Sequence, residues 1–148
     1  MNKYEVYDFP EVSSNVLIYE FTSFGPQGII KKIVEFEETA DRNIYNLAFG
    51  NLKEDGTIDD LITSNNDDRN KVITTVAYIV IKFTECRPDC YILFTGSTKA
   101  RTRLYRIAIT LNYQDLSKTL NIWGLHEEVG WEPFNSNSPY TSFLIKYK

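Results

Sequence analysis

The sequence has no run of apolar residues long enough to cross a membrane, which takes about eighteen consecutive ones. The first eight residues also lack the apolar core that a signal peptide needs. Both absences predict a cytoplasmic protein with no membrane segment.

Cysteine and histidine are scarce, with two Cys and one His in the whole chain. Cys86 and Cys90 flank a short turn, and a disulfide between them would close only a very small loop. Without a secretion signal, we expect free thiols. A structural zinc site needs more ligands than two thiols, and His126 lies far away in the sequence. We therefore predict no metal site at these residues.

Acidic residues could hold a hard cation through their oxygen atoms, but their spacing does not match an EF-hand loop. The candidates are Asp59, Asp60, Asp67 and Asp68. Turn formation and helix capping explain most of them, because acidic side chains favour the positive end of a helix dipole. The sequence therefore predicts neither a metal nor a cofactor.

Excess positive charge is also missing, since 16 basic residues face 20 acidic ones and the net charge is −4. This balance argues against broad attraction to nucleic acid or to anionic lipid, although a local basic patch remains possible. The length of 148 residues and the hydrophobic share of 43% predict one globular domain over residues 1–148. Ten Tyr and nine Phe favour β structure.

Most of the chain shows strand patterns that are broken by turn signals. Extended segments are predicted at residues 4–9, 16–23, 29–38, 43–51, 58–62, 90–95, 119–124 and 141–148. Gly25 to Gly28 predicts a hairpin turn. Within residues 43–51 one face carries large rings and the other carries small residues, which suggests that something packs closely there. Residues 126–139 look like a long loop.

Two segments have the 3.6-residue spacing of amphipathic helices. The first begins after the capping residues 64–68 and ends at Pro88, with a broad apolar stripe that predicts deep burial. The second follows Gly96 and continues to Leu111. The element order predicts an α+β fold, with a largely antiparallel sheet of about six or seven strands and two helices packed on one face. The sequence leaves the strand order and the oligomeric state open.

The most informative stretch is residues 94–106, where a strand pattern changes to a helix pattern around Gly96. A strand that ends in Thr-Gly-Ser-Thr and opens a helix presents backbone N–H groups at the positive end of a helix dipole, which favours anions. Arginine side chains can bind phosphate bidentately. We therefore predict that a phosphate of a nucleotide or nucleic acid binds at Gly96, Ser97, Thr98, Arg101, Arg103 and Arg106.

On a helical wheel this basic cluster divides into two parts. Lys99, Arg103 and Arg106 share one narrow stripe, while Arg101 lies on another flank. The alternative interpretation is ordinary capping at Ser97 or Thr98, followed by a solvated helix face. Its cations would then be paired with Glu35, Glu37, Asp59 or Asp60. The stretch matches neither a Walker A loop nor the dinucleotide-binding fingerprint.

A catalytic arrangement is also conceivable, with His126 or Tyr105 as a base and an arginine that stabilises a phosphorane. It depends on proximity that the sequence does not establish. Trp131 could cover a ligand or stack on a base, but a role as a plug at the open end of the core fits it better.

Two stretches carry a resemblance to a known family. They are Ser-Asn-Asn-Asp-Asp-Arg-Asn-Lys-Val at residues 64–72 and Phe-Thr-Gly-Ser-Thr-Lys-Ala-Arg-Thr-Arg-Leu-Tyr-Arg at residues 94–106. In these motifs the chain resembles a family of small uncharacterised bacterial proteins of unknown function, and the likeness runs nearly end to end. The resemblance implies a bacterial, cytoplasmic, single-domain protein and carries no established activity, cofactor or partner.

Three functional hypotheses follow from these observations. The leading one is a domain that binds an anionic, phosphate-bearing ligand or RNA. The second is an enzyme of the small-toxin type that processes RNA or a nucleotide. The third is a structural or partner-binding protein whose basic helix faces an acidic protein surface. The sequence does not decide whether the protein is an enzyme.

Overall fold

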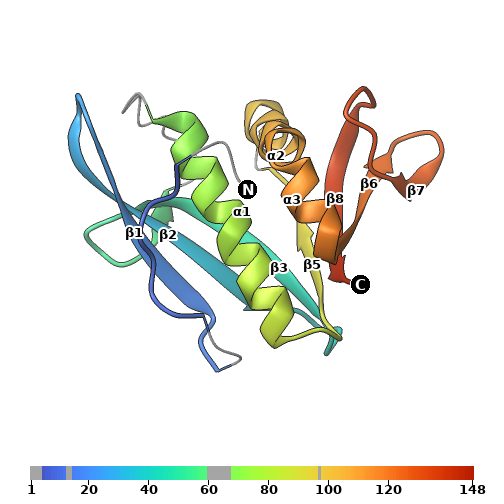
Figure 1. Ribbon diagram of the computed structural model, residues 1–148, viewed down its shortest axis with the longest axis horizontal. Coiled ribbons are helices and arrows are strands. Elements are labelled where there is room, and N and C mark those ends of the chain that lie inside the picture. Colours follow the sequence, from blue (N-terminus) through green and yellow to red (C-terminus); the bar gives the residue numbers. More distant parts are fainter. Residues whose placement is uncertain (1–4, 13–14, 60–67, 97) are drawn as a thin grey trace.

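The computed structural model describes residues 5–12, 15–59, 68–96 and 98–148. Figure 1 shows the helices packed on one face of a twisted sheet. The strands are β1 (Ile18–Gly25), β2 (Gly28–Glu38), β3 (Ile44–Leu52), β4 (Ile58–Asp59), β5 (Tyr91–Phe94), β6 (Leu120–His126), β7 (Gly130–Pro133) and β8 (Tyr140–Tyr147). The helices are α1 (Arg69–Cys86), α2 (Lys99–Leu111) and α3 (Tyr113–Thr119).

The described strands form one eight-stranded sheet in the order β1-β2-β3-β5-β8-β6-β7, with β4 paired to β3. Neighbouring strands run antiparallel except for β3 and β5, which are parallel. A parallel pair needs a long crossover connection, and α1 provides it. The prediction of an α+β fold with a largely antiparallel sheet is confirmed, although the described sheet is mixed and has eight strands where six or seven were expected.

Three elements differ from the predictions. The polar segment after Leu111 forms a third helix, α3, which is separated from α2 by the single residue Asn112. Residues 130–133 form β7, because Gly130 adopts a positive φ of 81° and turns the chain back along β6. Residues 5–9 are not a strand: the amide of Tyr7 donates to Thr75 Oγ1 on α1, 2.9 Å away, instead of joining the sheet.

The predicted apolar stripe of α1 is confirmed as its buried face. The buried members are Val72, Ile73, Val76, Ala77, Ile79, Val80 and Phe83. The ring of Phe83 stacks on Phe36 of β2 with centroids 3.8 Å apart. Tyr19 of β1 and Tyr45 of β3 meet Phe83 edge-on, so one ring joins α1 to three strands.

Small residues on the other face of β3 allow a close approach, as predicted. Gly50 is buried, and a Cβ atom added there would lie 2.4 Å from the carbonyl oxygen of Asp59. The chain of β4 therefore folds back directly over β3.

Truncation of Phe83 to Ala should lower the free energy of unfolding by about 3–5 kcal/mol, because it empties the site where α1 contacts three strands. Urea denaturation followed by far-UV circular dichroism measures the loss. Phe83→Leu keeps most of the apolar volume and should cost clearly less. Equal midpoints for wild type and Phe83→Ala would contradict this role of the ring.

Candidate functional site

The parallel pair β3–β5 places the carboxyl ends of both strands at one edge of the sheet. The helices that follow these strands, α1 and α2, therefore begin at this same edge (Figure 1). Helix N-termini carry partial positive charge, so two of them at one edge favour negatively charged groups. The polar side chains at this edge form the candidate site.

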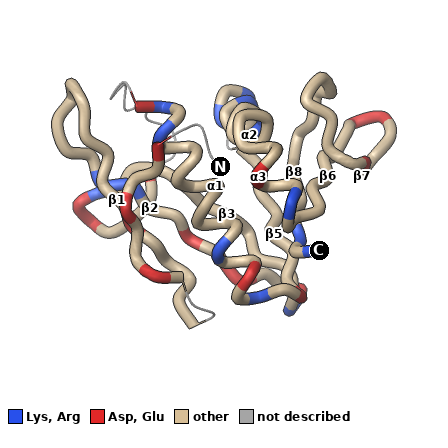
Figure 2. The backbone as a smooth tube through the Cα atoms, in the orientation of Figure 1, with Lys and Arg blue, Asp and Glu red and all other residues tan. Residues whose placement is uncertain are grey.

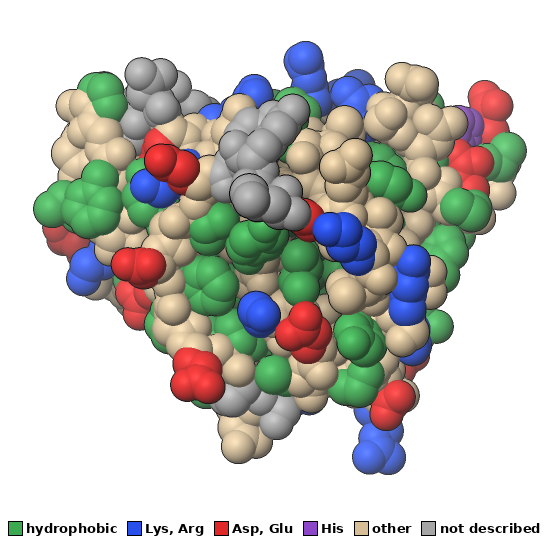
Figure 3. All heavy atoms as spheres, in the orientation of Figure 1, with side chains coloured by type: hydrophobic (Ala, Val, Ile, Leu, Met, Phe, Trp, Pro, Cys, Tyr) green, Lys and Arg blue, Asp and Glu red, His purple; other side chains and the backbone are tan. Residues whose placement is uncertain are grey.

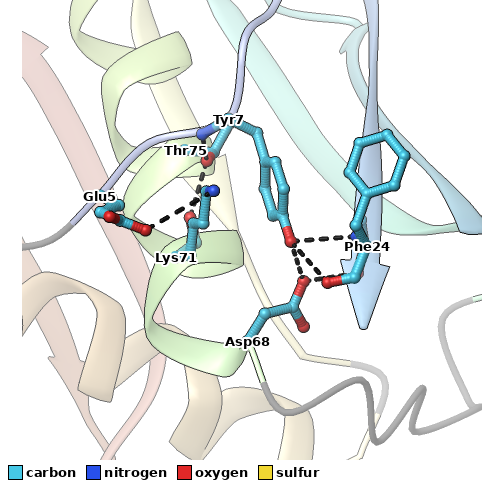
Figure 4. Close-up of polar contacts among 7 residues, drawn as sticks. Glu5, Tyr7, Phe24, Asp68, Lys71 and Thr75 are labelled. Carbon is cyan, nitrogen blue, oxygen red and sulfur yellow. Dashed lines mark hydrogen bonds and ion pairs between the residues drawn. The ribbon is translucent and has the colours of Figure 1, made fainter. Parts of the chain in front are cut away.

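Asp68 immediately precedes α1, yet its side chain makes no capping hydrogen bond to that helix. Its Oδ2 instead accepts from the Ser23 hydroxyl at 2.5 Å and from the Tyr7 hydroxyl at 2.6 Å. Figure 4 shows Tyr7 reaching from the N-terminal segment to Asp68 and Phe24. The carboxylate therefore joins the N-terminal segment, β1 and α1. Asp68 is the N-cap residue, so α1 begins directly after the predicted capping segment, but the Asp68 side chain does not supply the cap.

Tyr7 is held on several sides. Its hydroxyl accepts from the Phe24 amide at 3.0 Å, and the ammonium of Lys71 lies 4.1 Å from its ring centroid. Lys71 also pairs with Glu5 at 3.7 Å. Burial raises the pKa of Tyr7, and the hydrogen bond to the Asp68 carboxylate raises it further. The hydroxyl therefore remains a proton donor at neutral pH.

Lys32 is a buried cation on the helix-facing side of β2, with 5% of its surface exposed. Its Nζ donates to Asn51 Oδ1 at 2.5 Å. Burial lowers the pKa of Lys32, the Asp68 carboxylate raises it and the Arg101 guanidinium lowers it. Asp68 and Arg101 thus both act electrostatically on Lys32, which places these three charges in one neighbourhood.

The N-terminal turn of α2 is capped by a side chain, as predicted. Thr98 Oγ1 accepts from the Arg101 amide at 3.1 Å, which confirms Thr98 as the N-cap. Gly96 has no room for a side chain, because an added Cβ would lie 2.2 Å from the Thr102 amide nitrogen. Ser97 lies outside the described residues.

The arginines of α2 divide as the helical wheel predicts. The guanidinium of Arg101 lies over the Phe49 ring, 5.5 Å from its centroid, and faces the sheet. Arg103 is exposed and Arg106 is partly exposed, together with the exposed Lys99. Figure 2 shows basic residues concentrated on α2, and Figure 3 shows Lys and Arg side chains along the rim above it.

The second group, Lys99, Arg103 and Arg106, is the outer stripe of α2. Ion pairs between described residues join Lys71 to Glu5, Lys82 to Glu85 and Lys118 to Asp115, and none involves the outer stripe. Within the described part of the chain, the outer stripe is therefore not paired with Glu35, Glu37 or Asp59, and Asp60 lies outside that part.

A family model matches residues 3–148, which is nearly the whole chain. The chain belongs to this family of unknown function, DUF6934. The predicted resemblance to a family of unknown function is thereby confirmed. No curated protein and no solved structure matches the chain.

The structure gives no support to the catalytic alternative, in which His126 or Tyr105 acts as a base beside the arginines of α2. Tyr105 is 6% exposed and its ring meets Phe94 edge-on, so this side chain belongs largely to the core. His126 ends β6, and its Nδ1 accepts from the Glu128 amide in the same hairpin. Among the described residues, no hydrogen bond joins His126 to α2.

Trp131 does not plug the core of this DUF6934 protein. It lies on β7 with 45% of its surface exposed. Phe134 takes the predicted place instead, packing against Tyr113, Tyr140 and Phe143. The prediction for Trp131 is wrong because β7 is an edge strand, and Trp131 is on its exposed side.

Both cysteines have free thiols, with Cys86 exposed and Cys90 buried, as predicted. Across the described residues no group of three or more His, Cys, Asp or Glu side chains could hold a metal ion. Asp60 and Asp67 lie outside that part of the chain. The described helices include none that is long and apolar enough to cross a membrane.

Sequence reasoning missed four members of the candidate site, namely Tyr7, Ser23, Lys32 and Asn51. A signal for Lys32 was present, because it has the same strand parity as the apolar residues Val34 and Phe36. A lysine on the core-facing side of a strand indicates a special environment. Nothing local marks Tyr7 or Ser23, whose shared partner Asp68 is distant in the sequence.

Tyr7→Phe should lower the free energy of unfolding at neutral pH by about 1–2 kcal/mol, since it removes the donor to Asp68 and the acceptor for Phe24. The folded pKa of Tyr7 lies above the ordinary value of 10.0, so its stabilisation is present below that pH and is lost as the pH rises through the folded value. The stability gap between wild type and Tyr7→Phe should therefore narrow in alkaline solution.

Tyr113→Phe is the matched control, because Tyr113 is 43% exposed and its hydroxyl bonds to no described residue. It should leave the unfolding free energy unchanged across the same pH range. A gap between wild type and Tyr7→Phe that is absent at neutral pH would show that the Asp68 junction contributes nothing.

Proposed function

We propose that this protein binds an anionic, phosphate-bearing ligand along α2. The supporting observation is the outer stripe, in which Lys99, Arg103 and Arg106 share a helix face and form no ion pair with any described carboxylate. Three neighbouring cations on a rigid helix repel one another, and an anion relieves that repulsion. The outer stripe is accordingly the main binding surface in this proposal.

The start of α2 supplies a second part of the binding surface. Thr98 caps the Arg101 amide, while the first-turn amides of Lys99 and Ala100 donate to no described residue. Such N–H groups point out of the helix end, where the dipole favours a phosphate. Gly96 permits the close packing of this turn, and in the proposal Ser97 contributes its hydroxyl.

Arg101 has a different role from the outer stripe in this proposal. Its guanidinium lies over Phe49 on the sheet side of α2, and it acts on the charge of buried Lys32. It can reach a ligand only at the N-terminal end of the helix. Arg101 would therefore contact the terminal phosphate, whereas Arg103 and Arg106 would contact phosphates farther along.

The length of the outer stripe indicates the class of ligand. Lys99 and Arg106 are seven positions apart, which corresponds to roughly 10 Å along a helix axis. A single phosphate does not extend so far. Successive phosphates of one duplex strand are about 3.4 Å apart along the axis, so the outer stripe suits a nucleic-acid backbone or a polyphosphate chain.

Titration with single-stranded RNA, duplex RNA and nucleoside mono-, di- and triphosphates tests the proposal. Binding should be strongest for the ligands with several phosphates and should weaken as salt increases, because bound cations displace counterions. Arg103→Ala with Arg106→Ala should remove most of the affinity. It should also reduce the slope of log affinity against log salt by roughly 1.5.

Arg42→Ala with Lys53→Ala is the matched control, since both residues are exposed and the net charge changes equally. This control should retain the affinity and the salt slope of the wild type. Absence of binding at low salt, or equal losses in both double variants, would refute the proposal. Equal binding of polyglutamate would instead favour an acidic protein partner.

A further inference from the structure

β1 is the outer strand at one side of the sheet. Its pairing with β2 shows which of its residues direct their backbone N–H and C=O groups away from the sheet. The Phe36 amide donates to the Leu17 carbonyl at 2.8 Å, so these two residues form a hydrogen-bonded pair. Pairs alternate in an antiparallel ladder. The N–H and C=O groups of Ile18, Glu20, Thr22 and Phe24 therefore point away from β2, toward the open edge.

The N-terminal segment covers one end of this edge. The Phe24 amide donates to the Tyr7 hydroxyl, and that hydroxyl lies 3.2 Å from the Phe24 carbonyl oxygen (Figure 4). These contacts independently confirm that the Phe24 backbone faces outward. For Ile18, Glu20 and Thr22, the described residues offer no partner to the outward groups.

Apolar side chains accompany the open backbone groups. Ile18 is 50% exposed and Phe24 is 57% exposed on the face of β1 that points away from the helices. Ile29, opposite Phe24 on β2, is 69% exposed. An uncovered edge with exposed apolar side chains is a template for pairing with another strand.

The other side of the sheet is protected in the usual way. Its outer strand β7 has four residues and ends in Pro133, which has no amide hydrogen to donate. β1 is eight residues long and contains no proline. The two sides of the sheet therefore differ in their readiness to add a strand.

We propose that β1 pairs antiparallel with β1 of a second copy of this chain, about a two-fold axis at Phe21. In this register Glu20 of one copy faces Thr22 of the other, and Ile18 faces Phe24. The outward side chains read apolar, polar, polar, apolar in either direction, so the strand is complementary to itself.

The capping by Tyr7 restricts the backbone pairing between copies to the centre of this register. Phe24 already has backbone partners, so Glu20 and Thr22 are the central residues left to exchange hydrogen bonds between copies. A two-fold axis at Glu20 would set two carboxylates opposite each other, which is unfavourable. At each end, Ile18 of one copy would cover Phe24 and Ile29 of the other.

Sedimentation velocity over a wide range of chain concentrations tests this dimer. One strand pair with apolar contacts at its ends buries a small interface, so we expect a reversible monomer–dimer equilibrium. The dimer should have twice the chain mass of 17.2 kDa. A chain that remains monomeric at the highest soluble concentration would overturn the proposal.

Thr22→Pro provides a selective variant. The Thr22 amide points to the open edge, so proline removes a donor to the second copy and leaves the ladder between β1 and β2 in place. The variant should be monomeric, with wild-type far-UV circular dichroism. A folded Thr22→Pro chain that dimerises as tightly as wild type would overturn the proposal.

Ile18→Lys keeps the test decisive if the proline variant does not fold. A lysine at this exposed position is compatible with the monomer, and it should weaken dimerisation at least tenfold by placing a charge against Phe24. Val129→Lys is the matched control, because Val129 is 65% exposed in the hairpin between β6 and β7. Equal dimer affinities for these two lysine variants would refute the register.

Discussion

The parallel pairing of β3 with β5 is the constraint on which the arrangement of this protein depends. Parallel neighbours cannot be joined by a tight turn, so the chain crosses the sheet through α1 before β5 can pair. Phe83 secures that crossing by stacking on Phe36 and meeting Tyr19 and Tyr45 edge-on. As a consequence, α1 and α2 begin at the same edge, where their positive dipole ends add to the charges of Lys32 and Arg101.

Charge at this edge is organised in two layers. The inner layer contains Lys32, Asp68 and Arg101: the Asp68 carboxylate raises the pKa of Lys32, the Arg101 guanidinium lowers it, and Arg101 itself lies over the Phe49 ring of β3. The outer layer consists of the exposed stripe on α2. Removing a cation from water costs free energy, and for this reason burial lowers the pKa of Lys32. Burial of Lys32 in the inner layer therefore lowers the stability of the fold but holds its charge in a fixed position. The outer layer stays in contact with water, so its cations lose little hydration.

The local patterns predicted most elements, and their failures have physical causes. Alternation identified β3 through Tyr45, Leu47 and Phe49, and spacing identified the buried face of α1. Strand order was beyond reach because it depends on pairings between distant residues. The segment 5–9 has strand-like residues, yet the amide of Tyr7 donates to Thr75 on α1, a partner that no local pattern reveals.

The basic stripe was predicted correctly, because Lys99, Arg103 and Arg106 belong to one helix. The junction of Tyr7, Ser23 and Asp68 joins three separate segments and could not be predicted.

That junction also orders events during synthesis of the chain. Tyr7 and the β1–β2 hairpin are synthesised before Asp68, so the hydroxyl of Tyr7 has no carboxylate acceptor until the start of α1 has been made. Until then nothing anchors the N-terminal segment to α1, and the backbone of Phe24 stays as open as that of Glu20. In a chain that ends before α1, the outer edge of β1 therefore lacks the anchored Tyr7 cap at Phe24, and an uncovered edge strand is a site for unwanted strand pairing.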